Sequence, residues 1–268
     1  MGSEQRDDSW KAGDLYEPYV GRWSRRVADA FLAWIAVPAE AEWVDVGCGT
    51  GALTEAIFTT ARPRRVSAFD PSPGFLRFAQ RRVTHPSVTF AVADARALPV
   101  AADSVDATVA GLVINFVPEP SMGVREMARV TRAGGTVAAY VWDYADKMEL
   151  MRYFWDAAVA LDAVAGALDE GRRFPVCRPL ALEEMFNGIG LRDVATDAID
   201  IATNFASFDD FWSPFLGGQG PAPAYAMSLT EERRGVLRDR VRSALPRRDD
   251  GAVQLIARAW AVRGTKPA

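Results

Sequence analysis

An apolar strand enters a three-glycine turn in the stretch Val44-Asp45-Val46-Gly47-Cys48-Gly49-Thr50-Gly51, and a helical stretch over residues 52–58 follows directly. Glycine adopts positive φ easily and has no Cβ, so the backbone of such a turn can lie against a ligand. The unpaired N–H groups at the start of the helix then face the polar groups of that ligand. We therefore predict a nucleotide or nucleoside pocket here. The turn residues expected against the ligand are Gly47, Cys48, Gly49 and Gly51.

The spacing of the glycines does not choose the ligand by itself. It is G-x-G-x-G when read strictly, but Ala52 also completes the looser G-x-G-x-x-G/A pattern of dinucleotide-binding turns. A nicotinamide-dependent oxidoreductase therefore stays open as an alternative. Cys48 lies between two glycines and is interpreted as a small filler, because nothing in the sequence identifies a base beside it.

The composition is that of an ordinary globular chain. Of the 268 residues, 49% are hydrophobic and 25% are charged, which favours one or two domains with a sizeable core. The 31 Lys and Arg against 35 Asp and Glu leave a net charge of −4, so no basic field is available for a nucleic-acid backbone. Two distant cysteines and one histidine make a zinc site or a disulfide framework implausible, and we expect no metal.

The sequence predicts no contact with a membrane. Its longest apolar run, around residues 107–117, is too short to span a bilayer and is typical of a buried strand. The first eight residues lack the apolar core of a signal peptide. We therefore expect a cytoplasmic protein, and its oligomeric state stays open.

Strand and helix patterns alternate from residue 42 to residue 142. This alternation predicts an α/β fold in which a doubly wound, mostly parallel sheet carries helices on both faces. The predicted strands are 42–46, 65–69, 88–92, 105–113 and 136–142, and the predicted helices are 25–36, 73–82 and 122–130.

The alternation stops after Trp142, and the rest of the chain is mostly helical. Residues 147–167 have the pattern of one long helix. Ser207 and Ser228 have the spacing of helix caps, which predicts two more helices. Two late segments, 191–205 and 252–263, return to the strand pattern.

Five short motifs together resemble one protein family. They are Val-Asp-Val-Gly-Cys-Gly-Thr-Gly at 44–51, Phe-Asp-Pro-Ser-Pro at 69–73, Ala-Asp-Ala at 93–95, Asp-Ser-Val-Asp-Ala at 103–107 and Gly-Gly-Thr at 134–136. In these motifs the chain is similar to the class I S-adenosylmethionine-dependent methyltransferases, and within them to the type 11 small-molecule enzymes near the ubiquinone and menaquinone biosynthesis group. The resemblance implies S-adenosylmethionine as cofactor and a seven-stranded, Rossmann-like sheet with its last strand antiparallel.

The resemblance also implies how a single methyltransferase domain is divided along the chain. We expect an N-terminal lid helix, a cofactor-binding core, an inserted helical cap and two C-terminal strands. The lid helix is expected over residues 16–40 and the core over residues 41–144. The cap is expected over residues 145–178 and 207–245, and the two strands over residues 191–205 and 252–263.

Two carboxylates at strand ends are the expected anchors of the cofactor. Asp70 ends the second strand, where it can accept hydrogen bonds from both ribose hydroxyls, with Pro71 and Ser72 beside it. Asp94 ends the third strand, and the resemblance implies that it receives the exocyclic amine of adenine, with Ala95 next to it.

The resemblance suggests roles for further positions. Asp45 is expected to order the glycine turn, and the cofactor amine is a further partner for it. Asn115, after the fourth strand, is expected to contact the cofactor. Tyr16 and Trp23 belong to a segment that resembles the family's N-terminal lid, and they are our candidates for closing over the methionine end.

Methyl transfer from a sulfonium is an in-line displacement with an activated donor, so the site mainly has to align the acceptor and exclude water. A base helps only when the acceptor is protonated. Asp143, after the fifth strand, is the candidate base, whereas His85 belongs at the opposite end of the sheet. The acceptor is expected to be a small apolar or aromatic molecule, methylated on oxygen, nitrogen or carbon. A non-catalytic adenosyl-binding scaffold or regulator stays open as an alternative.

Overall fold

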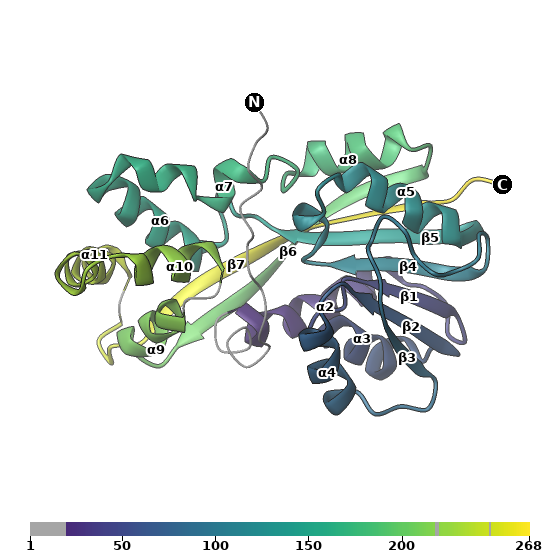
Figure 1. Ribbon diagram of the computed structural model, residues 1–268, viewed down its shortest axis with the longest axis horizontal. Helices are drawn as coiled ribbons and strands as arrows, with labels where there is room; N and C mark the ends of the chain where they lie inside the picture. The colour runs from purple at the N-terminus through teal and green to yellow at the C-terminus, as the bar shows by residue number, and fades with distance from the viewer. Residues whose placement is uncertain (1–19, 218–219, 247) are drawn as a thin grey trace.

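The computed structural model describes residues 20–217, 220–246 and 248–268 (Figure 1). The strands are β1 (Glu42–Val46), β2 (Arg65–Asp70), β3 (Val88–Val92), β4 (Val105–Gly111), β5 (Thr131–Trp142), β6 (Arg192–Phe205) and β7 (Val253–Thr265). Within these residues they form one seven-stranded sheet in the order β3-β2-β1-β4-β5-β7-β6. The strands β1 to β5 are parallel, and β7 is antiparallel to both of its neighbours. The predicted fold class is confirmed.

The strand order reverses at β1. The chain moves from β1 outward through β2 and β3, and then returns to the other side of β1 with β4. Loops that leave the carboxyl ends of β1 and β4 therefore diverge and open a crevice, which is the usual ligand position in open α/β sheets. The glycine turn follows β1 directly, so the topology puts it in this crevice.

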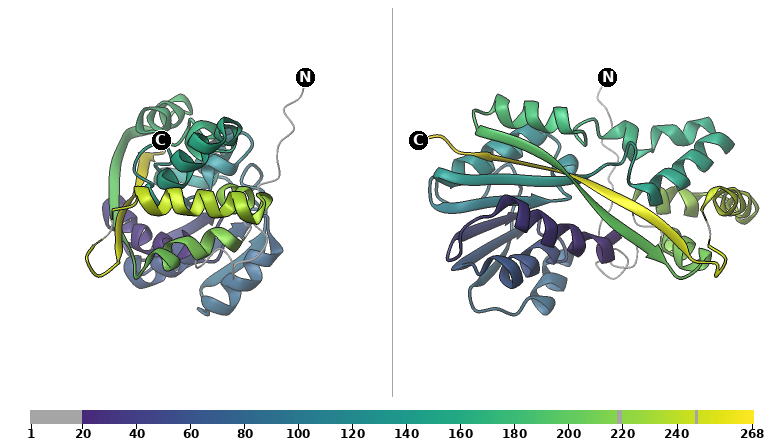
Figure 2. Two further views of the ribbon diagram at one scale, coloured as in Figure 1. Left: turned by 90° about the vertical axis from the view of Figure 1, so that its left-hand side faces the viewer. Right: turned by 180° about the vertical axis from the view of Figure 1, so that it is seen from behind.

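Helices cover both faces of the sheet. Those of one face are α2 (Arg22–Ile35), α3 (Ala52–Ala56) and α4 (Pro73–Arg82), and those of the other are α5 (Pro120–Val130) and α8 (Pro179–Gly188) (Figures 1 and 2). Val27, Phe31 and Ile35 are buried at helical spacing along α2. None of the helices in the described ranges is both long and apolar enough to pass through a bilayer.

A helical cap surrounds the far ends of β6 and β7, which extend beyond the parallel strands (Figure 1). The cap consists of α6 (Glu149–Leu161), the 3-10 turn η4 (Ala163–Ala167), α7 (Glu170–Arg173), α9 (Phe208–Trp212), the 3-10 turn η5 (Ser213–Gly217), α10 (Pro221–Ser228) and α11 (Glu231–Ala244). Phe154 of α6 is fully buried and stacks on Phe215, with ring centroids 4.5 Å apart. Aromatic residues of this kind form the core of the cap.

The helix predicted over residues 147–167 is interrupted. The helix α6 ends at Leu161, and the Asp162 carboxylate accepts a hydrogen bond from the N–H of Val164 at 3.0 Å. Aspartate favours such local bonds to nearby backbone, so the chain starts the separate turn η4 instead of continuing the helix. The prediction of one long helix is therefore wrong.

Two other predicted boundaries are also wrong. Ser228 ends α10, and Thr230 caps α11 instead by accepting a hydrogen bond from the N–H of Arg233. The fourth strand ends at Gly111 and not at Val113, because the residue between them adopts φ of 59°, outside the strand region.

Candidate functional site

The glycine turn exposes backbone where side chains would not fit. Gly47, Gly49 and Gly51 have positive φ, at 68°, 53° and 83°. A Cβ on Gly47 would lie 2.4 Å from the Cγ2 of Val113, so only glycine fits where the turn passes the loop after β4. The N–H of Gly51 donates to the carbonyl of Cys48 at 2.8 Å, which closes the turn just before α3.

Asp70 ends β2 and holds the turn from the side. Its Oδ2 accepts a hydrogen bond from the N–H of Gly49 at 2.9 Å, and its Oδ1 accepts one from the N–H of Ser72 at 2.8 Å. Burial raises the pKa of Asp70, and the two N–H donors oppose this rise. Because each carboxylate oxygen has a second lone pair, Asp70 orders the turn and can still accept hydrogen bonds from a ligand.

Asp45 in β1 is fully buried beside the same turn. The hydroxyl of Thr54 on α3 donates to its Oδ2 at 2.6 Å, whereas its Oδ1 has no partner among the described residues. Burial raises the pKa of Asp45 to about 7; the Thr54 hydrogen bond opposes this rise, and the charge of Asp70 adds to it. A buried acceptor atom without a partner fits a ligand that brings a hydrogen-bond donor.

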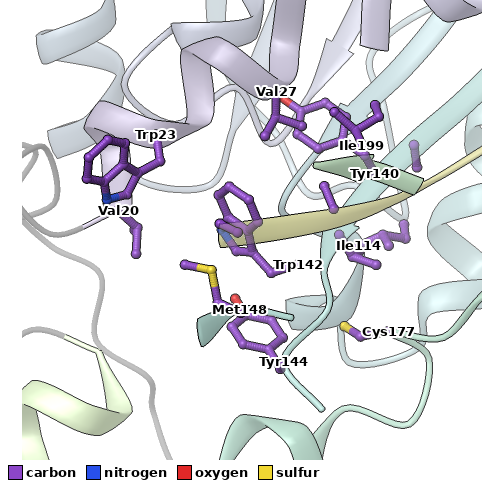
Figure 3. Packing of buried hydrophobic residues seen from close by; sticks show 14 of the residues in the cluster. Val20, Trp23, Val27, Ile114, Tyr140, Trp142, Tyr144, Met148, Cys177 and Ile199 are labelled. Carbon is purple, nitrogen blue, oxygen red and sulfur yellow. The ribbon is translucent and has the colours of Figure 1, made fainter. Parts of the chain in front are cut away.

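A cavity of about 540 Å³ lies against the turn, within the size range of small-molecule sites. Its polar wall includes the turn, Asp45 and Asp70, and its apolar wall includes Tyr140, Trp142 and Tyr144. Figure 3 shows these three aromatic side chains one after another along the end of β5 and the loop beyond it. Other described residues that line the cavity include Val20, Ser24, Leu112, Phe116, Met151 and Glu170.

The predicted site residues fall into two groups in the structure. Those that line the cavity are Gly47, Cys48, Gly49, Asp70, Pro71 and Ser72. Those that are not part of its lining are Trp23, Gly51, Asp94, Ala95, Asn115 and the candidate base Asp143. Tyr16 lies outside the described residues. Contact with a ligand stays a prediction for all of them.

Cys48 lines the cavity from between two glycines of the turn. Its side chain packs in a small apolar cluster with Ala68 and Leu76. Burial raises the pKa of the Cys48 thiol, and the nearby carboxylates of Asp45 and Asp70 add to this rise. The thiol therefore stays protonated at neutral pH, which fits a small filler and not a nucleophile.

Trp23 packs against the cap side of the protein. Its ring meets the ring of Phe205 edge-on, with centroids 5.4 Å apart, and the guanidinium of Arg22 lies 4.5 Å from its centroid. Val20 and Ser24 of the same segment line the cavity instead. This N-terminal segment therefore reaches the site through residues that sequence reasoning did not single out.

Asp94 follows β3, and its carboxylate is already bound. Arg96 donates from Nε and Nη2 to the two carboxylate oxygens, with a shortest distance of 2.6 Å. These hydrogen bonds hold the pKa of Asp94 below its ordinary value. The side chain of Asp94 is 47% exposed, so an adenine amine would have to share it with Arg96 and with water.

Asn115 and Asp143 are both buried outside the cavity lining. Neither the amide nitrogen nor the amide oxygen of Asn115 has a partner among the described residues. Asp143 lies between Trp142 and Tyr144, which both line the cavity, and its Oδ1 accepts a hydrogen bond from the N–H of Asp146 at 3.2 Å. Because Asp143 is not part of the cavity lining and its carboxylate accepts from the backbone of Asp146, this placement does not favour Asp143 as a base.

Sequence reasoning missed Glu170, the first residue of α7. It is 2% exposed and lines the cavity from the cap. The indole Nε1 of Trp155 donates a hydrogen bond to its Oε2. In the sequence Glu170 follows Asp169 in an acidic pair that has the composition of a solvated loop, so only the folded chain reveals its position.

The sequence similarity to known proteins lies mainly in the cofactor-binding half of the chain. Residues 44–139 match the model of a family described as "Methyltransferase domain". The chain is 39% identical over 114 residues to a demethylmenaquinone methyltransferase of Renibacterium salmoninarum, and the aligned region covers 42% of this chain and 45% of that protein. It is 32% identical over 153 residues to the 2-methyl-6-phytyl-1,4-hydroquinone methyltransferase 2 of Oryza sativa subsp. japonica, and the aligned region covers 57% of this chain and 38% of that protein. The chain spans between about a third and about half of the length of the curated relatives it matches.

A solved structure extends the likeness of fold to the cap. Phosphoethanolamine N-methyltransferase 2 of Haemonchus contortus, in complex with S-adenosyl-L-methionine, has a TM-score of 0.59 at 16% identity and covers 95% of this chain and 56% of that one. The segment matched by the family model contains the glycine turn, Asp45 and Asp70. Strand order, turn geometry and sequence matches agree that residues 44–139 belong to the methyltransferase domain family of class I S-adenosylmethionine-dependent methyltransferases.

Proposed function

We propose that this protein transfers a methyl group from S-adenosylmethionine to an oxygen, nitrogen or carbon atom of a small aromatic or apolar acceptor. The observation that carries the proposal is Asp45, a cavity-lining carboxylate whose buried Oδ1 has no partner among the described residues. S-adenosylmethionine supplies an activated methyl group on a positive sulfur, together with the hydroxyl and amine donors that carboxylates accept. The site therefore fits this cofactor.

The two buried carboxylates are proposed to divide the cofactor between them. Asp70 has lone pairs left for the ribose hydroxyls after accepting from the N–H groups of Gly49 and Ser72. Asp45 is proposed to accept from the amine, which satisfies its unpartnered oxygen. Gly47 lets the turn pack against Val113, where a Cβ would clash, and its backbone lines the cavity. These roles do not require a base, since the transferred methyl group is already activated.

The walls of the cavity support an aromatic acceptor. Phe116, Trp142 and Tyr144 line it with broad apolar faces, and such faces pack favourably on a flat ring. Two relatives are named for demethylmenaquinone and for a phytylated hydroquinone, which are ring acceptors of this kind. We therefore propose a small aromatic acceptor, held against this wall so that water is kept from the methyl group.

Calorimetric titration of the full chain with S-adenosylhomocysteine and with NAD tests the choice of cofactor. We expect S-adenosylhomocysteine to bind and NAD to give no measurable heat. Binding of NAD without binding of S-adenosylhomocysteine would support the nicotinamide-dependent oxidoreductase and would contradict this proposal.

Label transfer tests whether the bound cofactor reacts. The protein is incubated with methyl-labelled S-adenosylmethionine and metabolite extracts, and we expect label in a small molecule. The Asp70→Ala variant should lose transfer at limiting cofactor, whereas the matched change of an exposed aspartate on α11, Asp239→Ala, should not. Binding of S-adenosylhomocysteine with no label transfer in any extract would favour the adenosyl-binding scaffold.

A further inference from the structure

One cavity carboxylate is not used by the proposed cofactor contacts. Asp45 and Asp70 reach the cavity from the ends of β1 and β2, whereas Glu170 reaches it from α7 in the cap. A Cβ on Gly171 would lie 2.7 Å from the carbonyl oxygen of Tyr144, so α7 packs directly on the loop after β5. Glu170 therefore belongs to the wall that carries the aromatic residues, where the acceptor is proposed to bind.

The neighbouring helix α6 holds Glu170 in place. Trp155 of α6 donates a hydrogen bond to its Oε2. Asp169 caps α7 by accepting from the N–H of Gly171 at 2.9 Å, and it also accepts from Arg152 of α6 at 2.8 Å. Two adjacent acidic residues are thus tied to one helix, so the Glu170 carboxylate has a defined position at the cavity.

Protein stability alone does not explain why the buried Glu170 is a carboxylate. Burial raises the pKa of Glu170 to about 7; its own N–H and Trp155 oppose this rise, and the charge of Asp169 adds to it. Replacing a buried charged group by an apolar residue of similar size is often neutral or stabilising, so stability alone does not require Glu170. Above this pKa it is ionised and is available as a hydrogen-bond acceptor for a bound molecule.

The charges around the cavity restrict what that molecule can be. The described residues of its lining include three carboxylates, Asp45, Asp70 and Glu170, and no Lys, Arg or His. An acceptor with a carboxylate or phosphate near Glu170 would meet like charge in a partly desolvated place and would find no cation there. A hydroxyl or an amine would find an acceptor atom instead.

We propose that Glu170 binds the methyl acceptor, by accepting a hydrogen bond from a hydroxyl or amine group that the aromatic ring carries directly or through one carbon. The cavity then selects neutral or cationic ring compounds against anionic ones. The proposal rests on the proposed methyl transfer, because that function assigns Asp45 and Asp70 to the cofactor and leaves Glu170 for the acceptor. Phe116 and Met151 supply apolar contacts to the ring.

Calorimetry on the full chain saturated with S-adenosylhomocysteine tests this selection, at a pH above the raised pKa of Glu170 so that its carboxylate is ionised. The probes share one ring system, carry their polar group through one carbon and differ in charge: the alcohol 2-naphthalenemethanol, the ammonium compound 2-naphthylmethylamine and the carboxylate 2-naphthoate. The wild type should bind the alcohol and the ammonium compound about tenfold or more tightly than the carboxylate, which is the range of one hydrogen bond to a charged group. The two favoured probes also distinguish a neutral acceptor from a cationic one.

The Glu170→Gln variant removes the charge and keeps an oxygen for the Trp155 indole. It should lose most of the preference over 2-naphthoate, with the ammonium compound weakened about tenfold and the alcohol less. The matched change Glu184→Gln, at an exposed position of α8, should leave all three affinities unchanged. The Glu170→Asp variant keeps the charge and should keep the order of the three probes, which provides a second test if Glu170→Gln fails to fold.

The outcomes separate this proposal from the function on which it rests. Failure of the wild type to bind S-adenosylhomocysteine removes the proposed function. Normal binding of S-adenosylhomocysteine with equal affinity for the probes in the wild type and in Glu170→Gln overturns only the role of Glu170. That role is also overturned if the wild type binds neither the alcohol nor the ammonium compound, or if Glu170→Asp prefers the carboxylate.

Discussion

The cofactor-binding half and the cap reach the same cavity in different ways. In the first half, Asp45 and Asp70 lie in or at the end of parallel strands, next to a turn whose φ angles require glycine. In the cap, aromatic side chains such as Phe154 and Phe215 pack on one another, and Glu170 reaches the cavity from a short helix held by α6. Short-range chain geometry places the first set of groups, whereas long-range packing places the second.

This difference has consequences for what a mutation should change. A site residue of the cofactor half contacts the turn or is proposed to contact the ligand, so its loss should appear first in cofactor affinity. A core residue of the cap contacts other cap residues, so its loss should appear first in stability. The two effects can be measured independently on the same variants, from the free energy of unfolding and from calorimetric affinity for S-adenosylhomocysteine.

The largest effect is expected from Phe154→Ala in the cap core. Phe154 is fully buried and packs against Phe215 and Trp155, so its truncation should lower the free energy of unfolding by about 3–5 kcal/mol. Denaturant unfolding measures this loss, and Val164→Ala at an exposed position of η4 is the control. Affinity for S-adenosylhomocysteine should stay unchanged in the folded variant. A parallel loss of affinity would show that the two regions do not act separately.

Asp70→Ala should have the next largest effect, on cofactor affinity. The variant loses the proposed acceptor for the ribose hydroxyls and the two hydrogen bonds that order the turn, which should weaken binding of S-adenosylhomocysteine by about 1.5–3 kcal/mol. Calorimetry measures the change, with Asp239→Ala as the exposed control. Unchanged affinity would mean that the ribose lies elsewhere.

The same contrast explains how far the sequence could predict the fold. The strand predicted at 42–46 matches β1, because apolar residues between turn signals make a buried strand visible in sequence. The interruption of 147–167 was not visible, since Asp162 breaks a helix only by a local hydrogen bond to the N–H of Val164. Ser228 and Thr230 both have the chemistry of a cap, and tertiary packing decides between them.

The site shows the same limit. Asp70 could be assigned because a strand end fixes where a side chain lies, and the structure puts it on the cavity. The Asp94 carboxylate is bound by Arg96, a contact that the motif does not reveal. Glu170 had no signal at all, because its place depends on how α7 packs on the loop after β5. The sequence therefore predicts the place of a residue next to the strand end or turn that carries it, as for Asp70, and does not predict the side-chain contacts that it makes there.

The buried carboxylates of the two halves make stability depend on pH. Burial raises the pKa of Asp45 from 3.8 to about 7, so between these values the folded state keeps a proton that the unfolded state has released. The free energy of unfolding should therefore fall as the pH rises through this window. In Asp45→Asn, which has no carboxylate to titrate at this position, the fall should be smaller, as measured by denaturant unfolding at both ends of the window.

Glu170→Gln is the matched variant from the cap for this measurement. The pKa of Glu170 is also raised to about 7, so the sign of its contribution is the same as that of Asp45. Saturating S-adenosylhomocysteine should change the pH dependence in the Glu170→Gln protein, where Asp45 remains, and should leave it nearly unchanged in Asp45→Asn. The reverse pattern would place the cofactor donor at Glu170 and would break the division between the two halves.

The smallest effect is expected at Asp94, which follows a strand of the cofactor half but is exposed and is not part of the cavity lining. Its carboxylate is exposed and shared with Arg96, so Asp94→Ala should weaken binding of S-adenosylhomocysteine by only about 0.5–1 kcal/mol. Arg96→Ala frees both carboxylate oxygens and should tighten binding slightly, which calorimetry on the same preparations can measure. If Asp94→Ala costs as much as Asp70→Ala, Arg96 must leave the carboxylate when the cofactor binds. Burial would then not determine which carboxylates of this half contribute most to the affinity for S-adenosylhomocysteine.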